Sequence, residues 1–235
     1  MPKVAVASFN LHWGLDRRGA AFDQVAACRR LDADVLVLQE AWRQEGERGA
    51  AATIADELGY QVHLVELAQA RWGKTPRIVQ QLGRAHGRWG FAVLTRQPVR
   101  RVWEIDMGRM WLDVTRRAAL AVEVALGAST LTVIATHLSH LSHGSPIQVR
   151  RLRQDLPDPS QPAVLLGDLN MWGPWASALL PGWKRAVKGR TWPAHRPHSQ
   201  IDHILVSGPV KVLDSGVGVF SGSDHRPVRA VLSIP

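Results

Sequence analysis

Short apolar segments separated by polar turns run along most of the chain. Residues 3–9 and 34–39 are rich in Val and Leu and contain few polar residues, a pattern typical of strands buried on both faces. Residues 118–126 and 129–136 predict a hairpin that turns at Gly127-Ala128. Further strands are predicted at 60–66, 91–95, 99–105, 163–167, 201–206, 210–213 and 228–234.

Helical spacing of apolar residues separates several of these strands. Gly59 predicts the end of one helix, and Ser145-Pro146 predicts the start of another, because a hydroxyl residue followed by Pro is common there. The predicted helices are 20–31, 50–58, 148–156 and 174–180. This mixed order favours two packed layers of strands with helices outside, in a single domain of the α/β (α+β) class over residues 1–235.

The charge of the chain favours anionic partners. Among 235 residues, 29 Lys and Arg stand against 20 Asp and Glu, which leaves a net charge of +9. Such an excess attracts polyanions, so nucleic acid or an anionic phospholipid surface is favoured over a cationic partner. Cations spread evenly over a solvated surface would give the same balance. Charge alone therefore leaves the partner open.

Cys28 is the only cysteine, so the sequence excludes an intrachain disulfide and a thiolate metal site. Its apolar neighbours indicate a buried, unreactive thiol. Residues 1–4 lead directly into a predicted strand without the apolar core of a secretory signal, and no apolar stretch is long enough to cross a bilayer. We therefore expect a cytoplasmic, monomeric protein without a transmembrane segment.

Polar residues follow several predicted strands at the point where each strand ends. Asn10 and Glu40 follow the first two strands, His137 follows the hairpin, and Asp168 precedes Asn170 after strand 163–167. Any one of them alone is usually a turn or surface residue. Together they supply the hard oxygen ligands and imidazoles that suit a divalent cation and a phosphate. The pattern therefore indicates metal-dependent phosphoester chemistry.

Asp168 and Asn170 lie two positions apart. In an extended backbone residues at this spacing point to the same side, so we expect both side chains to face one site. Gly167 would allow another chain segment or a ligand to approach closely. An Asp/Asn turn after a strand is the alternative interpretation of this segment.

The adjacent residues Asp224 and His225 form the strongest local signal. In a regular strand two neighbours cannot point at one atom, so we expect one to bind metal and the other to contact phosphate. Asp202 is the expected carboxylate partner that orients His225. The sequence assigns no role to His12, His140 or His143.

These motifs resemble the endonuclease/exonuclease/phosphatase superfamily, which includes pancreatic-type deoxyribonucleases, exonuclease III-like enzymes, neutral sphingomyelinases and inositol polyphosphate 5-phosphatases. The resemblance spans essentially the whole chain, from Phe9-Asn10 to the segment at 223–228, and includes the internal segment 90–96. It implies a four-layer α/β/β/α sandwich in which two packed mixed sheets are flanked by helices.

The resemblance also implies residue roles. It makes Glu40 a ligand of Mg²⁺ (or Mn²⁺), with Asn10 and Asp224 close to the metal. It implies that Asp168 activates or aligns the attacking water and that Asn170 orients the water or the phosphate. The remaining implied roles are transition-state stabilisation by His137 and His225, buttressing of His225 by Asp202, and phosphate binding by Arg117, for which Arg116 is equally available.

Two basic segments carry aromatic residues and suggest the substrate. The first contains Arg71, Lys74 and Arg77, and the second contains Trp192 and Arg196. Cations beside flat rings suit a nucleic-acid backbone and its unstacked bases. Basic loops also suit anionic phospholipids. DNA is favoured over RNA as the partner.

Three functions remain open at this stage. The first is a Mg²⁺-dependent phosphodiester hydrolase that acts as an endo- or exonuclease. The second is a phosphatase or a phospholipid- or sphingomyelin-type phosphodiesterase of the same fold. The third is a non-catalytic binding scaffold, against which the complete set of polar residues argues.

Overall fold

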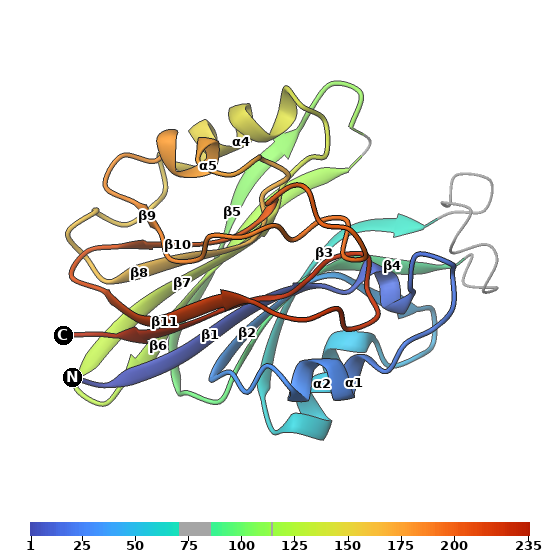
Figure 1. Ribbon diagram of the computed structural model, residues 1–235, viewed down its shortest axis with the longest axis horizontal. Coiled ribbons are helices and arrows are strands. Elements are labelled where there is room, and N and C mark those ends of the chain that lie inside the picture. Colours follow the sequence, from blue (N-terminus) through green and yellow to red (C-terminus); the bar gives the residue numbers. More distant parts are fainter. Residues whose placement is uncertain (71–85, 114) are drawn as a thin grey trace.

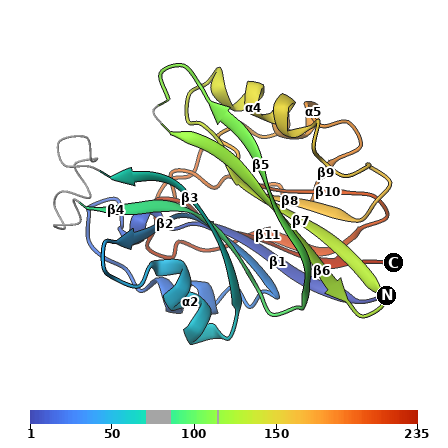
Figure 2. The same ribbon diagram turned by 180° about the vertical axis from the view of Figure 1, so that it is seen from behind.

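The computed structural model describes residues 1–70, 86–113 and 115–235. These residues form two six-stranded sheets that pack face to face, with helices on the two outer sides (Figure 1). The view from behind shows the same arrangement, with α2 below one sheet and α4 and α5 above the other (Figure 2). The expected α/β/β/α sandwich of the α+β class is confirmed.

The first sheet has the strand order β11-β12-β1-β2-β4-β3 within the described residues. β1 and β2 are parallel, and the other neighbours are antiparallel. The strands are β1 (Lys3–Asn10), β2 (Val35–Gln44), β3 (Gln61–Ala70), β4 (Gly87–Thr95), β11 (Lys211–Val217) and β12 (Val228–Ser233).

The second sheet has the strand order β5-β6-β7-β8-β10-β9 in the same part of the chain. Only β7 and β8 are parallel among these described neighbours. The strands are β5 (Val99–Arg109), β6 (Arg116–Leu126), β7 (Ser129–His137), β8 (Ala163–Asp168), β9 (Lys184–Arg185) and β10 (Asp202–Ser207).

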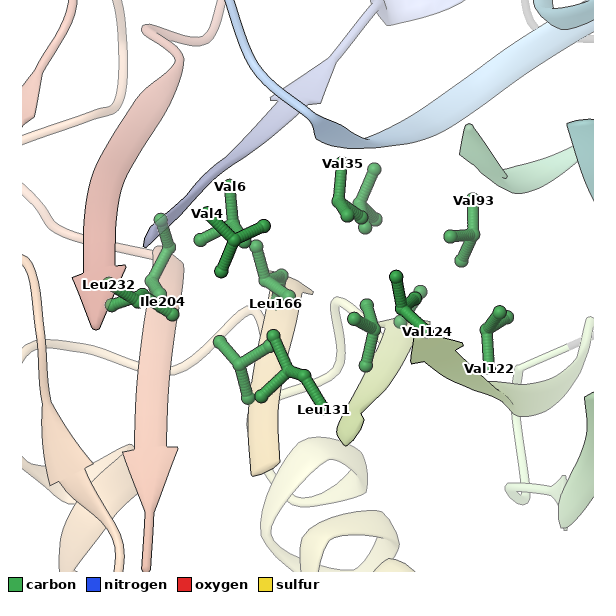
Figure 3. Close-up of a cluster of buried hydrophobic side chains, with 14 of the residues drawn as sticks. Val4, Val6, Val35, Val93, Val122, Val124, Leu131, Leu166, Ile204 and Leu232 are labelled. Atoms are coloured by element: carbon green, nitrogen blue, oxygen red, sulfur yellow. The ribbon is translucent and has the colours of Figure 1, made fainter. Parts of the chain in front are cut away.

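The apolar runs in the sequence arise because the central strands are buried on both faces. In β2, Val35 and Val37 point into the core between the sheets, whereas Leu36 and Leu38 pack toward the helices. Figure 3 shows the core between the sheets, where Val4, Val6, Val35 and Val93 of the first sheet meet Val122, Val124, Leu131, Leu166 and Ile204 of the second. A strand covered on both sides has no polar alternation.

Among the described residues, two helices cover each sheet. The helices α1 (Gln24–Arg29) and α2 (Ala50–Leu58) pack on the first sheet, and α4 (Gly144–Leu152) and α5 (Trp175–Ala178) pack on the second. α2 has the predicted bounds, and it ends because Gly59 adopts a left-handed φ of 71°.

Two helices begin elsewhere than predicted. α1 is shorter than 20–31 because Asp23 caps it, with its side chain accepting a hydrogen bond from the Ala26 N–H at 2.8 Å. α4 begins at Gly144, before Ser145. The Ser145 hydroxyl does not cap the helix but donates to the Ser139 carbonyl at 2.8 Å. The two-residue strand β9 and the 3-10 turn His12–Gly14 were not predicted.

Cys28 lies in the core with 1% of its surface exposed, and burial raises the pKa of its thiol to about 12. The predicted inert thiol therefore fits its environment. In the described part of the chain, every helix is too short or too polar to span a bilayer.

Candidate active site

The ends of two parallel strand pairs meet at one edge of the sandwich. β1 and β2 run in parallel, and Asn10 pairs with Gln39, the residue that precedes Glu40. β7 and β8 run in parallel as well, and His137 is the partner of Asp168. β10 begins with Asp202 opposite Asp168. The topology thus gathers polar residues from both sheets in one place.

Glu40 occupies a β-bulge in β2. Gln39 pairs with Phe91 of β4 and Ala41 pairs with Gly90, so Glu40 is the extra residue between them. Its φ of 52° is left-handed, which costs a residue other than glycine about 1–3 kcal/mol. The bulge re-aims the side chain out of the strand's regular alternation. Glu40 consequently lines the cavity described below.

Asn10 links one carboxylate from each sheet. Its side chain is fully buried, and Nδ2 donates to Glu40 Oε1 at 3.3 Å and to Asp168 Oδ2 at 3.1 Å. Its Oδ1 accepts the backbone N–H of His12 at 2.9 Å. With all these contacts Asn10 fixes the spacing of the two acids.

Asp168 and Asn170 both line the cavity, but through a turn and not through an extended strand. β8 ends at Asp168, Asn170 has a φ of 48°, and its N–H donates to Asp168 Oδ1 at 2.9 Å. The Asn170 Nδ2 group donates to the Leu138 carbonyl at 3.0 Å. The expected i, i+2 geometry is therefore replaced by the alternative turn, which local hydrogen bonding favours.

Gly167 provides the close approach that the sequence predicted. Its φ is 151°, and a Cβ at this position would lie 2.0 Å from the Thr136 carbonyl oxygen. The segment that approaches is the neighbouring strand β7. This contact brings the strand ends that carry His137 and Asp168 together.

Asp202 lies directly against His225. Both carboxylate oxygens are within hydrogen-bond distance of His225 Nδ1, at 3.0 and 3.1 Å. Burial on its own would lower the pKa of His225, but Asp202 in contact with it, with Asp168 and Asp224 nearby, raises that pKa to about 10. His225 is therefore a cation at neutral pH, with Nε2 facing the acids.

Asp224 and His225 face the same site. They lie in a bend before β12, so the alternation of a regular strand does not separate them. Asp224 Oδ1 is 3.9 Å from His225 Nε2 and 3.6 Å from His12 Nδ1. The Trp192 indole N–H donates to Asp224 Oδ2 at 3.4 Å. The division expected from the sequence, with one of the two binding metal and the other contacting phosphate, stays a prediction.

His137 is almost completely buried beside two acids. Its Nε2 is 3.6 Å from Asp168 Oδ2 and 4.0 Å from Glu40 Oε1. Burial, reinforced by nearby Arg117, lowers the pKa of His137 well below its ordinary value. Nδ1 makes no hydrogen bond with any described residue. His137 is therefore neutral. Its ring makes a T-shaped contact with the ring of Trp89, with 5.9 Å between the ring centroids.

Of the two neighbouring arginines, Arg117 is the buried one. Its Nε is 3.3 Å from Asp113 Oδ2, and Nη1 donates to the His137 carbonyl at 3.2 Å. Arg116 instead pairs on the surface with Glu104 and Asp106. Arg117 is thus tied to the backbone of His137 and places a fixed cation near the acids.

A cavity of about 1390 Å³ opens above these groups. Trp192 lines it, whereas Arg196 is exposed and does not. Three other predicted substrate-binding residues, Arg71, Lys74 and Arg77, lie outside the described residues. Of the residues predicted to be catalytic or metal-binding, Glu40, His137, Asp168, Asn170 and His225 line the cavity, whereas Asn10, Asp202 and Asp224 do not.

The carboxyl groups at the cavity floor lie close enough together to disfavour each other's ionised form. Burial raises the pKa of Asp168 to about 7, and Asp202 adds to this rise. Burial likewise raises the pKa of Glu40, with Asp224 contributing, while His225 and His12 lower it. Carboxylates so close together favour a shared proton or a bound cation.

The donor set fits a hard divalent cation. Glu40, Asp168 and Asp224 offer carboxylate oxygens, and Asp224 Oδ1 is buried without a hydrogen-bond partner among the described residues. Asp168, Asp202 and His225 also bring ligand-type atoms within 4.8 Å of one another. Asp202 and His225 already hydrogen-bond each other, which takes up part of the ligand capacity of this group.

Three contributing residues were missed in the sequence. His12, two positions after Asn10, lies beside Asp224. Asp113 holds Arg117. The Thr191 hydroxyl oxygen accepts the N–H of Asp202 at 3.2 Å. Only His12 carries a usable signal, its closeness in sequence to a candidate residue, because the other two contacts depend on tertiary packing.

Comparisons with known proteins agree with this fold. A family model described as the Endonuclease/Exonuclease/phosphatase family matches residues 7–225. The endonuclease/exonuclease/phosphatase from Beutenbergia cavernae has a TM-score of 0.74 at 22% identity, covering 100% of this chain and 72% of its own. At such identities a structural likeness shows the fold alone.

Two further solved structures resemble the chain. A family protein from Bacteroides thetaiotaomicron has a TM-score of 0.74 at 15% identity, covering 99% of this chain and 98% of its own. Truncated TDP2 from Caenorhabditis elegans has a TM-score of 0.65 at 18% identity, covering 99% and 98%. No curated protein matches the chain.

Proposed function

The chain belongs to the endonuclease/exonuclease/phosphatase family, and from this membership we propose that it is a divalent-metal-dependent phosphodiester hydrolase that acts on nucleic acid. The observation that carries the proposal is the environment of Asp168. Its Oδ2 lies 3.1 Å from Asn10 Nδ2, 3.6 Å from His137 Nε2 and 3.9 Å from His225 Nε2. A buried acid held by an amide and two imidazoles is suited to proton transfer at neutral pH.

Glu40 and Asp224 are the proposed metal ligands, with Asn10 setting their distance from Asp168. The support is that Glu40 lines the cavity together with Asp168, and that Asp224 Oδ1 is buried without a hydrogen bond to any described residue. When bound, Mg²⁺ or Mn²⁺ would polarise a phosphoryl oxygen and neutralise its charge.

Asp168 is the proposed acceptor of the proton from the attacking water. The pKa of about 7 lets its Oδ2 hold that proton while the water oxygen bonds to phosphorus and the bond to the leaving oxygen breaks. Asn170, fixed by its bond to Leu138, is proposed to orient the water or the phosphate.

The two imidazoles and Arg117 are proposed to stabilise charge on the phosphoryl oxygens. His225 is held as a cation by Asp202, and Arg117 is held by Asp113. His137 is neutral, so it would contribute a hydrogen bond and not a charge. Preorganised donors in a site largely shielded from water are effective because they need no reorientation during the reaction.

The proposal of nucleic acid as substrate rests on charge and aromatic content. The chain carries a net charge of +9, and Trp13, Trp89 and Trp192 line the cavity together with the proposed catalytic residues. Polyanions with flat bases match both features.

The test is a hydrolysis panel with metal-stripped protein. Single- and double-stranded DNA, RNA, bis-p-nitrophenyl phosphate and p-nitrophenyl phosphate are incubated with Mg²⁺ or with EDTA. We expect cleavage of the polymers only with Mg²⁺, its loss in Asp168→Asn, and normal rates in the exposed control Asp214→Asn. Hydrolysis of the monoester alone, or full activity of Asp168→Asn, would overturn the proposal.

A further inference from the structure

Four exposed apolar side chains that the proposed mechanism does not use lie in two segments next to strands of the second sheet, and two of them line the cavity. Among the described residues, Trp111, Trp172 and Trp175 are the exposed tryptophans, at 85%, 68% and 67%, and Leu112 is 73% exposed. Trp111 and Leu112 lie between β5 and β6, Trp172 lies between β8 and α5, and Trp175 is the first residue of α5. We call these four residues the apolar rim.

Two members of the apolar rim face the catalytic cavity. Leu112 and Trp172 line it together with Glu40, Asp168 and His225. Both segments adjoin strands of the second sheet, whose helices α4 and α5 lie above its strands in Figure 1. Leu112 and Trp172 are therefore part of the entrance to the proposed phosphoester site.

Packing does not explain why these side chains are exposed. α5 is anchored by Ala176 and Leu180, which are buried in the core under the second sheet, while Trp175 of the same helix points to solvent. Exposed apolar groups gathered at a cavity usually mark a ligand site. Here the ligand would be the part of the substrate next to the reacting phosphate.

The depth of the site limits what can reach it. Asp168, His137 and His225 are 2%, 4% and 6% exposed, so a phosphoester must enter the cavity before it can react. The groups attached to that phosphate then lie at the entrance, where they meet Trp172 and the exposed Arg109. A flexible strand can bend into such a recess, whereas a rigid duplex keeps its bases stacked on each other.

The aromatic lining of the cavity favours a base over a lipid chain. Trp13 and Trp89 line the side of the first sheet, and Trp172 lines the side of the second. Flat rings on two sides of a recess, with a cation at the rim, suit the face of a nucleobase and its phosphate. A bilayer surface would contact only the tips of the side chains that protrude from the apolar rim.

We infer that Trp172 and its neighbours in the apolar rim stack on an unpaired base next to the phosphate, so that the protein binds single-stranded nucleic acid in preference to duplex. This inference rests on the proposed function, because it places the reacting phosphate at the cavity floor. Trp172 is the central residue, since it is both highly exposed and part of the cavity wall.

The test measures binding without turnover, by fluorescence anisotropy in EDTA. The probes are a labelled oligothymidylate, a duplex of equal length, and an oligomer with the same phosphates and sugars but no bases. Trp172→Ala should weaken oligothymidylate binding about tenfold and leave the base-free oligomer unaffected. Trp172→Phe should retain most of the affinity, and the exposed control Leu213→Ala should match the wild type.

Three outcomes would overturn the inference. One is unchanged oligothymidylate affinity in Trp172→Ala, and another is equal weakening for the base-free oligomer. The third is binding to vesicles containing phosphatidylglycerol that Trp111→Ala and Trp172→Ala abolish while oligothymidylate affinity is unchanged, which would assign the rim to a membrane. Thermal melts verify that each variant is folded.

The inference and the proposed function can fail separately. Metal-dependent cleavage of bis-p-nitrophenyl phosphate with no effect of Trp172→Ala on binding would retain the hydrolase and reject the base-stacking rim. If oligothymidylate binding depends on Trp172 but the protein hydrolyses no phosphodiester, the base-stacking rim is retained and the hydrolase is rejected.

Discussion

At the scale of single residues, Asp202 is expected to act through His225. It is 99% buried, touches His225 Nδ1 with both oxygens and has no place in the lining of the cavity. A carboxylate in this position fixes the ring and keeps it charged. We therefore expect it to act as a positioning residue.

This coupling predicts a non-additive mutant cycle. His225→Gln should lower kcat/KM by about 10²–10³-fold, the usual cost of one transition-state donor. Asp202→Asn should cost about 10–100-fold, as loss of an orienting partner does. The double variant should be no slower than His225→Gln alone. A double variant whose loss equals the product of both would show that Asp202 acts independently.

The buried carboxyl group of Asp168 is expected to lower the stability of the metal-free protein near neutral pH. Its pKa of about 7 in the folded state exceeds the ordinary value of 3.8. The unfolded chain releases the proton near pH 4 and the folded chain near pH 7, so stability falls as the pH rises between these values. Above pH 7 the loss is complete.

Asp168→Asn should therefore stabilise the metal-free protein at pH 8, by about 2 kcal/mol or roughly 4–8 °C in Tm. The gain should shrink as the pH is lowered toward 4. Thermal melts in EDTA across this range measure it. A gain that is constant with pH, or a loss at pH 8, would contradict the assignment of a raised pKa.

At the scale of elements, strand contacts decide where the catalytic groups lie. β8 lies close against β7 at Gly167, where a Cβ would lie 2.0 Å from the Thr136 carbonyl oxygen. Gly127, in the β6–β7 turn, also has a positive φ, 66°, but a Cβ there would meet nothing within 4 Å. Substitutions at these two glycines therefore distinguish the cost of backbone strain alone from the cost of strain combined with a steric clash.

Gly167→Ala should destabilise the protein by about 3 kcal/mol or more, because it adds the clash to the strain, and should also reduce activity by moving His137 and Asp168 apart. Gly127→Ala should cost about 1 kcal/mol and leave activity unchanged. Denaturant titration and hydrolysis rates measure both. Equal costs for the two variants would show that the close strand contact is unimportant.

The elements themselves were largely predictable, because strands buried on both faces leave long apolar runs in the sequence. The α2 bounds also followed from Gly59. The geometry of Glu40 was not predictable, because a β-bulge depends on the register with β4 and not on the local sequence. The turn at Asn170 was named only as an alternative, since Asp-x-Asn fits both a strand and a turn.

The candidate site residues and the pairing of Asp202 with His225 could be predicted from the sequence, but the other contacts could not. Asn10 donates to acids from two sheets, and Arg117 is buried while Arg116 is exposed. Both facts follow from the packing of one sheet on the other. No spacing along the chain contains that information.

At the scale of the whole molecule, the net charge of +9 should make binding to nucleic acid depend on salt. Replacing Arg71, Lys74 and Arg77 together by Ala should reduce the slope of log affinity against log salt by about 2–3 if all three contact phosphates. The matched control replaces Lys3, Arg30 and Lys211, exposed cations away from the strand ends that carry the site. An equal reduction in both triple variants would indicate binding by net charge alone.

We propose that groups scattered along the chain form one ionic pocket that holds a divalent cation. The most direct test is calorimetric titration of metal-stripped protein with Mn²⁺, comparing the wild type with Glu40→Gln, Asp224→Asn and the exposed control Asp214→Asn. We predict equal affinity in the wild type and the control, and affinity weaker by about tenfold or more in both site variants. Unchanged Mn²⁺ affinity in Glu40→Gln and Asp224→Asn would contradict the account.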